Sequence, residues 1–202
     1  MDWKLQFVEQ ETQHKFLNFY TFHYEVDGAP YSYFVASRND KEHLLSLTRN
    51  YQRPDGVLIV ALKDEGENCS VLMIEEFRPA ANAVVLEFPA GLLDPQDESV
   101  EQTAIRESLE EAGVVLKDVR LLCPPSPTSI GLSDEMLAVV EGKVDSTCDA
   151  HKERFEDINA RFVPLRDVRA LLDDPHRLIA LNVRLCLEIL LERYAEPLQL
   201  KK

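Results

Sequence analysis

The most restrictive feature of the sequence is a short acidic helix near the middle of the chain. Ser99, followed three residues later by Gln102, forms a capping-box pattern, and Gly113 supplies the left-handed position that commonly ends a helix. These signals predict a helix from Val100 to Ala112. Any fold adopted by this chain must accommodate that helix and the charges it carries.

Three glutamates gather on one face of the predicted helix. At about 100° per residue, Glu110 and Glu111 lie within about 60° of Glu107. Like charges at this spacing cost about 0.2–0.5 kcal/mol per pair in water, so a solvated face tolerates them. A divalent cation would turn the repulsion into binding energy, and oxygen ligands on adjacent turns suit Mg²⁺ or Mn²⁺. The helix alone leaves both interpretations open. The opposite face, expected to enter the core, carries Ile105, Leu109 and Ala112.

Aromatic and β-branched runs predict the strands of an α+β protein. Two such runs between Lys15 and Arg38, separated by "DGAP", are typical of an antiparallel hairpin. The order of strands and helices favours an α+β fold or an α/β/α sandwich over a regular βαβ succession. The other predicted strands cover residues 57–62, 70–77, 83–88, 119–123, 136–144 and 160–165.

The C-terminal part of the chain predicts two helices. The first covers "LRDVRALLDD", and the second begins after Asp174 as N-cap, with Pro175 at the first helical position. Three- and four-residue steps predict that one stripe of the second helix packs on the core. This stripe consists of Leu178, Leu181, Leu185 and Ile189.

Composition restricts the partners. Thirty-six acidic against twenty-two basic residues give a net charge of −14, which argues against nucleic-acid binding because phosphate neutralisation needs clustered Lys and Arg. A small anionic substrate would then need a local arginine or metal ion. The four cysteines form no C-x-x-C pair, and residues 1–15 lack the regions of a signal peptide. No run approaches a membrane span. We therefore expect a cytoplasmic protein with reduced thiols and no membrane partner.

The segment "EFPAGLLDPQDESVEQTAIRESLEEAGV" resembles the Nudix box, written G-x5-E-x7-R-E-U-x-E-E-x-G-U with U apolar. Two positions depart from it. Gly91 and Glu98 are separated by six residues, so Asp97 competes with Glu98 for that role, and Ser108 occupies a position that is usually apolar. The matching positions are Gly91, Glu98, Arg106, Glu107, Glu110, Glu111, Gly113 and Val114.

The resemblance covers residues 15–194 and is greatest to the ADP-ribose pyrophosphatase branch of the Nudix hydrolases. It implies a Nudix-type α/β/α sandwich with a mixed sheet, preceded by a small N-terminal antiparallel β segment. We expect residues 1–53 to form that segment, which serves dimerisation in this branch, and residues 54–202 to form the hydrolase domain. The implied protein is a homodimer acting on a small nucleotide sugar.

The implied reaction is Mg²⁺-dependent hydrolysis of a nucleoside diphosphate linked to another moiety, with ADP-ribose giving AMP and ribose 5-phosphate. UDP-glucose or GDP-mannose would require the same chemistry and a different base pocket. Base selectivity would rest on N-terminal aromatics such as Phe19, Tyr20 or Tyr24, which could instead pack within the hairpin. A non-catalytic nucleotide-binding module with the same fold is a third hypothesis.

The resemblance also assigns the metal ligands. Glu107 and Glu111 would bind Mg²⁺, or Mn²⁺ in its place, with the Ala90 carbonyl as a backbone ligand and Glu110 completing the shell or bridging several ions. Arg106 would orient these carboxylates by charge-assisted hydrogen bonds. An ordinary helix salt bridge is the alternative for Arg106.

Substrate and water are assigned to residues outside the helix. Arg78 would grip a diphosphate oxygen and Glu87 would contact substrate or metal, unless both take part in a sheet-edge ion pair that also involves Glu76. In the long connection "CPPSPTSIGLSDEMLAVV", Glu135 is expected to act on the attacking water, with Asp134 as second choice. Both carboxylates could alternatively be loop caps.

Overall fold

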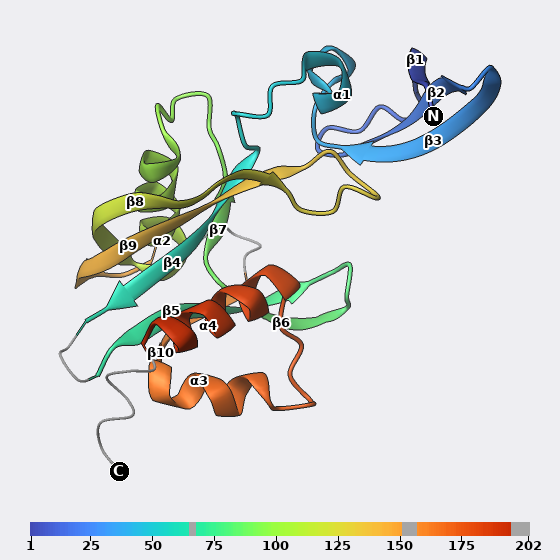
Figure 1. The fold of residues 1–202 in the computed structure, drawn as a ribbon. Coiled ribbons are helices and arrows are strands. Elements are labelled where there is room, and N and C mark those ends of the chain that lie inside the picture. The colour runs from blue at the N-terminus through green and yellow to red at the C-terminus, as the bar shows by residue number, and fades with distance from the viewer. Residues whose placement is uncertain (65–67, 151–156, 195–202) are drawn as a thin grey trace. The chain divides into compact units, whose positions relative to one another are not determined.

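The computed structural model describes residues 1–64, 68–150 and 157–194 (Figure 1). Its contacts group the chain into two compact units, residues 1–55 with 124–138 and residues 56–123 with 139–202. No described helix is long and apolar enough to cross a membrane. In chain order the elements are β1 Trp3–Gln10, β2 Asn18–Val26, β3 Ala29–Ser37, the 3-10 turn η1 Lys41–His43, α1 Leu45–Thr48, β4 Gly56–Lys63, β5 Ser70–Arg78, β6 Ala83–Glu87, β7 Ala90–Leu92, α2 Val100–Ala112, β8 Val114–Pro127, β9 Met136–Thr147, β10 Ile158–Pro164, α3 Leu165–Leu172 and α4 Leu181–Arg193.

The N-terminal unit contains a three-stranded antiparallel sheet in the order β1-β2-β3. The predicted hairpin is confirmed as β2 and β3, joined by Asp27 and Gly28 at φ 49° and 83°. Positive φ at both turn residues matches the right-handed twist of the strands. Strand β1 was not predicted; its pairing with β2 carries a register shift between Leu5 and Phe7.

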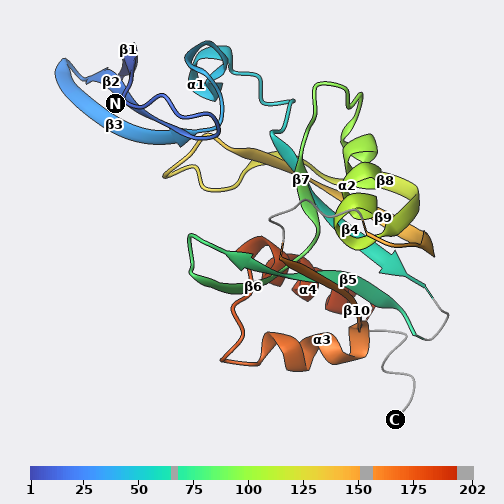
Figure 2. The ribbon, with the colours of Figure 1, turned by 180° about the vertical axis from the view of Figure 1, so that it is seen from behind.

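The second unit is built on a sheet in the order β10-β5-β4-β9-β8, with β6 paired to β5 and β7 paired to β4. Strand β4 is apolar and buried along nearly its whole length, as expected of a strand covered on both faces. Its residues Leu58, Val60 and Leu62 share a core with α3 and α4. Helix α2 covers the opposite face, as Figures 1 and 2 show. The α/β/α sandwich is confirmed.

Helix α4 begins later than predicted. Ala180, rather than Asp174, is its N-cap residue, and the preceding segment pairs with β6. The Leu86 N–H donates to the Leu178 carbonyl at 2.8 Å, and the Ala180 N–H donates to the Leu86 carbonyl at 3.2 Å. Asp174 accepts from the His176 N–H at 2.9 Å, so it caps a turn. The predicted start was wrong because the backbone groups of this segment form hydrogen bonds with the edge of β6 instead of within a helix.

The predicted packing stripe of α4 was also wrong. Leu181 and Leu185 are 72% and 55% exposed, and Leu178 and Ile189 are exposed as well. The helix is apolar on more than one side, and a second set with three- and four-residue steps enters the core instead. This set consists of Val183, Leu187 and Leu190.

Candidate active site

Helix α2 has the predicted bounds and caps. The Ser99 hydroxyl accepts from the Gln102 N–H at 3.2 Å, and Gly113 ends the helix at φ 63°. In a standard capping box the Gln102 side chain would accept from the Ser99 N–H. Here it accepts from the Glu98 N–H instead, at 2.8 Å. The caps therefore fix both ends of the helix, and with them the positions of the three glutamates on it.

The buried face of α2 differs from the prediction. Ile105 is 39% exposed, whereas Ala104, Ser108 and Glu111 are buried. Small side chains let the helix approach β4 and β7 closely, so the face chosen by tertiary packing includes a glutamate. The Ser108 hydroxyl oxygen has no hydrogen-bond partner in the described part of the chain.

Two of the three glutamates lie directly against the backbone of β7. A Cβ atom placed on Gly91 would overlap Cδ, Oε1 and Cγ of Glu107, so only glycine leaves room for that carboxylate. Glu111 is 7% exposed, and its Oε2 accepts from the Ala90 N–H at 3.2 Å. Strand β7 therefore brings the Glu107 and Glu111 carboxylates against the same short backbone segment.

Burial makes this arrangement electrostatically costly. Desolvation raises the pKa of the Glu107 carboxyl above its ordinary value, and the neighbouring charge of Glu110 adds to the rise. The Arg106 guanidinium opposes both effects. A carboxylate held in such surroundings is stabilised by any further positive charge that reaches it.

Arg106 is the centre of the ion-pair network. Its Nη1 donates to Glu107 Oε1 at 2.7 Å and to Glu110 Oε2 at 3.1 Å. Its Nη2 donates to Asp97 Oδ2 at 2.9 Å and to the Leu92 carbonyl at 3.1 Å. The hydrogen bond to Asp97 raises the pKa of Arg106 above its usual range, burial opposes this rise, and Glu107 adds to it. One guanidinium thus joins α2, the end of β7 and the intervening loop.

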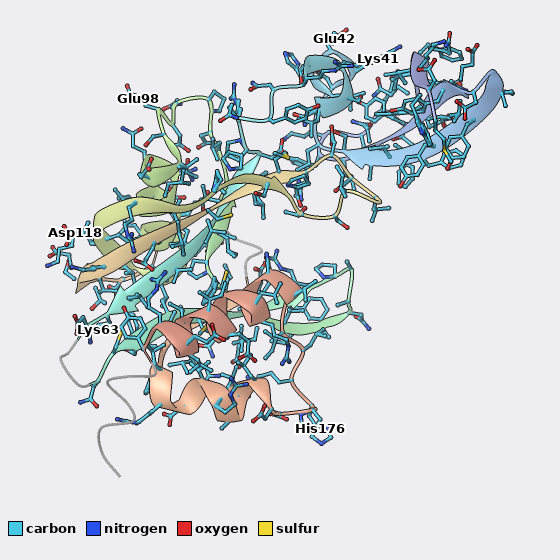
Figure 3. All side chains as sticks on the ribbon, viewed as in Figure 1. Lys41, Glu42, Lys63, Glu98, Asp118 and His176 are labelled. Atoms are coloured by element: carbon cyan, nitrogen blue, oxygen red, sulfur yellow. The ribbon has the colours of Figure 1, made fainter. Side chains whose placement is uncertain are left out.

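Asp97 rather than Glu98 contacts the arginine. Asp97 also accepts from the Thr103 hydroxyl at 3.0 Å and from the Asp94 N–H at 2.9 Å. Glu98 is exposed on the loop before α2 (Figure 3). The extra loop residue therefore places the preceding carboxylate against Arg106.

We expect Asp97→Asn to destabilise the protein by roughly 1–3 kcal/mol at neutral pH, the scale of a lost hydrogen bond to a charged group. The Arg106 hydrogen bond lowers the pKa of Asp97 from 3.8 to about 2. Because the unfolded chain binds a proton first, this stabilisation is present above about pH 4 and is lost as the pH falls towards 2. Urea unfolding of both proteins between pH 2 and pH 7 measures it.

Glu98→Gln is the matched control, because its side chain is exposed, and it should change stability by less than about 0.5 kcal/mol. Equal losses in the two variants would contradict the assignment of Asp97 as the arginine partner. A difference between Asp97→Asn and wild type that persisted undiminished at pH 2 would contradict the proposed charge effect.

Arg78 and Glu87 form an ion pair at the end of β5 and β6. Arg78 Nε donates to Glu87 Oε2 at 2.8 Å, and Arg78 Nη2 lies 3.0 Å from Glu76 Oε2. Burial works against the charge, but Glu87, Glu76 and Glu111 raise the pKa of Arg78 above its ordinary value. The Arg78 side chain is 41% exposed. It therefore remains accessible to an anion while these carboxylates hold it.

Glu135 and Asp134 belong to the N-terminal unit. Glu135 Oε1 accepts from Arg38 Nε at 3.2 Å, and Oε2 accepts from the Thr128 hydroxyl at 2.9 Å. Asp134 is buried and accepts from the Leu45 N–H at 3.1 Å. Neither Arg38 nor Leu45 carries a sequence signal for these contacts, since both are distant in the chain.

The N-terminal aromatics divide between core and surface. Tyr20 is fully buried, and its hydroxyl donates to the Asn39 carbonyl at 2.9 Å, so it is a core residue of the small sheet. Phe19 is exposed and Tyr24 is partly buried. Packing therefore accounts for Tyr20, whereas Phe19 remains available to a ligand or a partner.

The donor set of α2 and β7 fits a hard divalent cation. All the candidate ligands are oxygens, and Gly91 leaves the space that the Glu107 carboxylate fills against β7. Within the described ranges, no three His, Cys, Asp or Glu side chains already converge as a metal-binding group. Arg106 forms ion pairs with Glu107 and Glu110 and places a positive charge beside both carboxylates.

Comparison with known proteins identifies the fold and the family. The NUDIX domain model matches residues 52–182. The ADP-ribose pyrophosphatase of Bacillus subtilis (strain 168) is 31% identical over 128 residues, which are 63% of this chain and 64% of the relative. Nudix hydrolase 14, chloroplastic, of Arabidopsis thaliana is 30% identical over 135 residues, 57% of this chain and 43% of the relative. The chain therefore spans less than two thirds of the length of these relatives.

A solved structure shares the fold over nearly the whole chain. The crystal structure titled ADP compounds hydrolase superposes with a TM-score of 0.72 and covers 97% of this chain and 96% of its own. Its sequence identity is 18%. At that identity the likeness establishes the architecture, including the N-terminal sheet.

Proposed function

Because the chain belongs to the Nudix family, we propose that it hydrolyses the diphosphate of a nucleoside diphosphate linked to a second moiety. The observation that carries this proposal is the seating of Glu107 and Glu111 against β7, where Gly91 leaves room for one carboxylate and the Ala90 N–H binds the other. Burial disfavours the charged form of such carboxylates, and a bound cation would offset that cost in addition to Arg106. Its place in the box of a family that generally uses divalent metals supports a Mg²⁺ site.

The cation would be held by Glu107, Glu110, Glu111 and the Ala90 carbonyl, with Mn²⁺ as an alternative to Mg²⁺. When bound, such an ion neutralises phosphate charge and lowers the pKa of a coordinated water. The carboxylates Glu107 and Glu110 are oriented by Arg106, which bonds to both. Arg106 therefore acts on the ligands rather than on the substrate.

The remaining steps fall to residues outside α2. Arg78, accessible at the end of β5, would bind a diphosphate oxygen, with Glu87 holding its guanidinium in place. Glu135 would accept the proton of the attacking water. The water oxygen bonds to phosphorus while the bond to the bridging oxygen breaks, which gives two phosphomonoesters. Positioning and electrostatics supply most of the acceleration in such reactions.

ADP-ribose is the proposed substrate, with AMP and ribose 5-phosphate as products. Support comes from the similarity to the Bacillus subtilis ADP-ribose pyrophosphatase and from the "EFPAG" segment that places Glu87 and Ala90 directly before the box. UDP-glucose and GDP-mannose present the same diphosphate to the same carboxylates. A non-catalytic nucleotide-binding module is the alternative of another class.

A nucleotide-sugar panel tests the proposal. ADP-ribose, UDP-glucose and GDP-mannose are incubated with the protein and Mg²⁺ or Mn²⁺, and phosphate is measured after phosphatase treatment, which acts only on the cleaved monoesters. We expect the highest kcat/KM for ADP-ribose and no phosphate with EDTA. Binding of ADP-ribose without turnover in saturating Mg²⁺ and Mn²⁺ would favour the binding module.

We also propose that the protein is a cytoplasmic homodimer assembled through residues 1–53. The small sheet supports this, because exposed apolar patches often mark protein–protein interfaces, and this sheet exposes several large aromatic side chains. Trp3, Phe7 and Phe34 are each more than half exposed, and Phe7 stacks on His23 with centroids 4.2 Å apart.

A further inference from the structure

The loop that carries Glu135 packs on the N-terminal sheet. Residues 124–138 belong to the same compact unit as residues 1–55. The Tyr33 hydroxyl donates to the Gly131 carbonyl at 2.7 Å, and the Ala36 N–H donates to the Leu132 carbonyl at 2.9 Å. Ala36 also forms a parallel bridge with Ser133. Strand β3 therefore sets the register of the loop up to two residues before Glu135.

The residues on either side of Glu135 are fixed as well. Asp134 is 7% exposed, and its Oδ2 accepts from the Leu45 N–H at 3.1 Å. The Met136 N–H donates to Asp55 Oδ2 at 2.8 Å, and Asp55 is held in turn by Asn39. Groups from residues 1–55 thus pin the backbone on both sides of Glu135.

The Glu135 carboxylate itself receives one donor on each oxygen. Arg38 Nε lies 3.2 Å from Oε1, and the Thr128 hydroxyl lies 2.9 Å from Oε2. Thr128 belongs to the same loop, so Arg38 is the donor that links the carboxylate to β3. The Glu135 side chain stays 30% exposed. Arg38 can therefore fix its direction without blocking it from water.

We propose that Arg38 is a positioning residue for Glu135. The inference rests on the proposed function, in which Glu135 acts on the attacking water. Arg38 lies outside residues 52–182, which the NUDIX domain model matches. A charge-assisted hydrogen bond holds the carboxylate in one direction, and small misplacements of a reacting group are costly.

A double-mutant cycle tests this role. Arg38→Ala should lower kcat about 10- to 100-fold and change KM less than about 2-fold. Arg38→Lys should restore part of the loss because it keeps the charge. In a Glu135→Gln background, Arg38→Ala should cause no further loss, since the two residues act as one unit. The control is Lys41→Ala, which removes an exposed cation from η1 in the same unit (Figure 3).

Several outcomes would overturn the inference. If the fold losses in kcat of Arg38→Ala and Glu135→Gln multiply in the double variant, the two residues act independently. A rise in KM alone would make Arg38 a substrate contact. Unchanged kcat in Arg38→Ala would also reject it. If wild type turns over no member of the panel, the proposed function fails instead.

Amide hydrogen exchange gives a readout that needs no turnover. Arg38→Ala should speed exchange in peptides covering residues 124–138, while peptides from β5 keep the wild-type rate. Lys41→Ala should leave both sets unchanged. Wild-type protection of the loop in Arg38→Ala would contradict a positioning role, whichever substrates the protein turns over.

Discussion

Replacing Glu111 by glutamine is expected to abolish Mg²⁺-dependent hydrolysis and leave the protein folded. Glu111 is buried at the contact of α2 with β7, where it accepts from the Ala90 N–H. The glutamine carbonyl can accept the same bond, and a neutral amide costs less to bury than a carboxylate. Loss of the charge removes the proposed metal ligand, and a bound metal ion contributes several kcal/mol in such reactions, so turnover should fall at least about 10³-fold.

Three measurements separate this effect from misfolding. These are the phosphate-release rate with ADP-ribose, the Mg²⁺ concentration giving half-maximal rate, and the urea midpoint. Glu101→Gln is the control, because it neutralises a carboxylate in the first turn of the same helix. The urea midpoint of Glu111→Gln should equal or exceed that of wild type. An active Glu111→Gln protein would rule out the metal assignment.

Gly91→Ala should impair the site while changing no ionisable group. The new methyl would occupy the position of the Glu107 carboxylate, so that side chain must swing away from β7. If Glu107 is a metal ligand as proposed, its displacement weakens cation binding and misplaces the reacting groups, and we expect kcat/KM to fall about 10²-fold. Since the displaced atoms are the end of a flexible side chain, the loss of stability should stay near the low end of about 1–3 kcal/mol.

Gly142→Ala is the matched control, because its new methyl would meet the apolar side chains of Leu116, at 3.2 Å from Cδ1, and Val119, at 3.3 Å from Cγ2. It should retain wild-type activity. Raising Mg²⁺ or Mn²⁺ should recover part of the Gly91→Ala activity if weak cation binding is the cause. Wild-type kcat/KM in Gly91→Ala would show that the position of Glu107 against β7 is unimportant.

Most of the secondary structure follows from local sequence. The bounds of α2 were predicted because a side-chain cap and a glycine at positive φ act within a few residues of each end. The hairpin of β2 and β3 follows from Asp27 and Gly28 in the same way. Strand β7 was missed, because three residues carry too little pattern to be distinguished from a loop.

Longer-range features escaped prediction for one physical reason, which is that several faces or partners were locally equivalent. Helix α4 offers two apolar stripes, and only packing on the sheet selected Val183, Leu187 and Leu190. The helix starts later than predicted because the segment before it forms backbone hydrogen bonds with Leu86 at the edge of β6. In α2 the side that includes Ile105 stays exposed, and the buried face is one of small residues that approaches β7 closely.

The sequence by itself determined the family resemblance, the acidic helix and the residue types available to bind a cation, because these depend on spacing along one chain segment. Only the tertiary structure decided that Asp97 contacts Arg106, that Gly91 makes room for Glu107, and that Arg38 binds Glu135. Each of these contacts joins groups whose distance depends on how strands and loops fold together. Hydrogen bonds form between the groups that packing brings within reach, and spacing in sequence does not specify that.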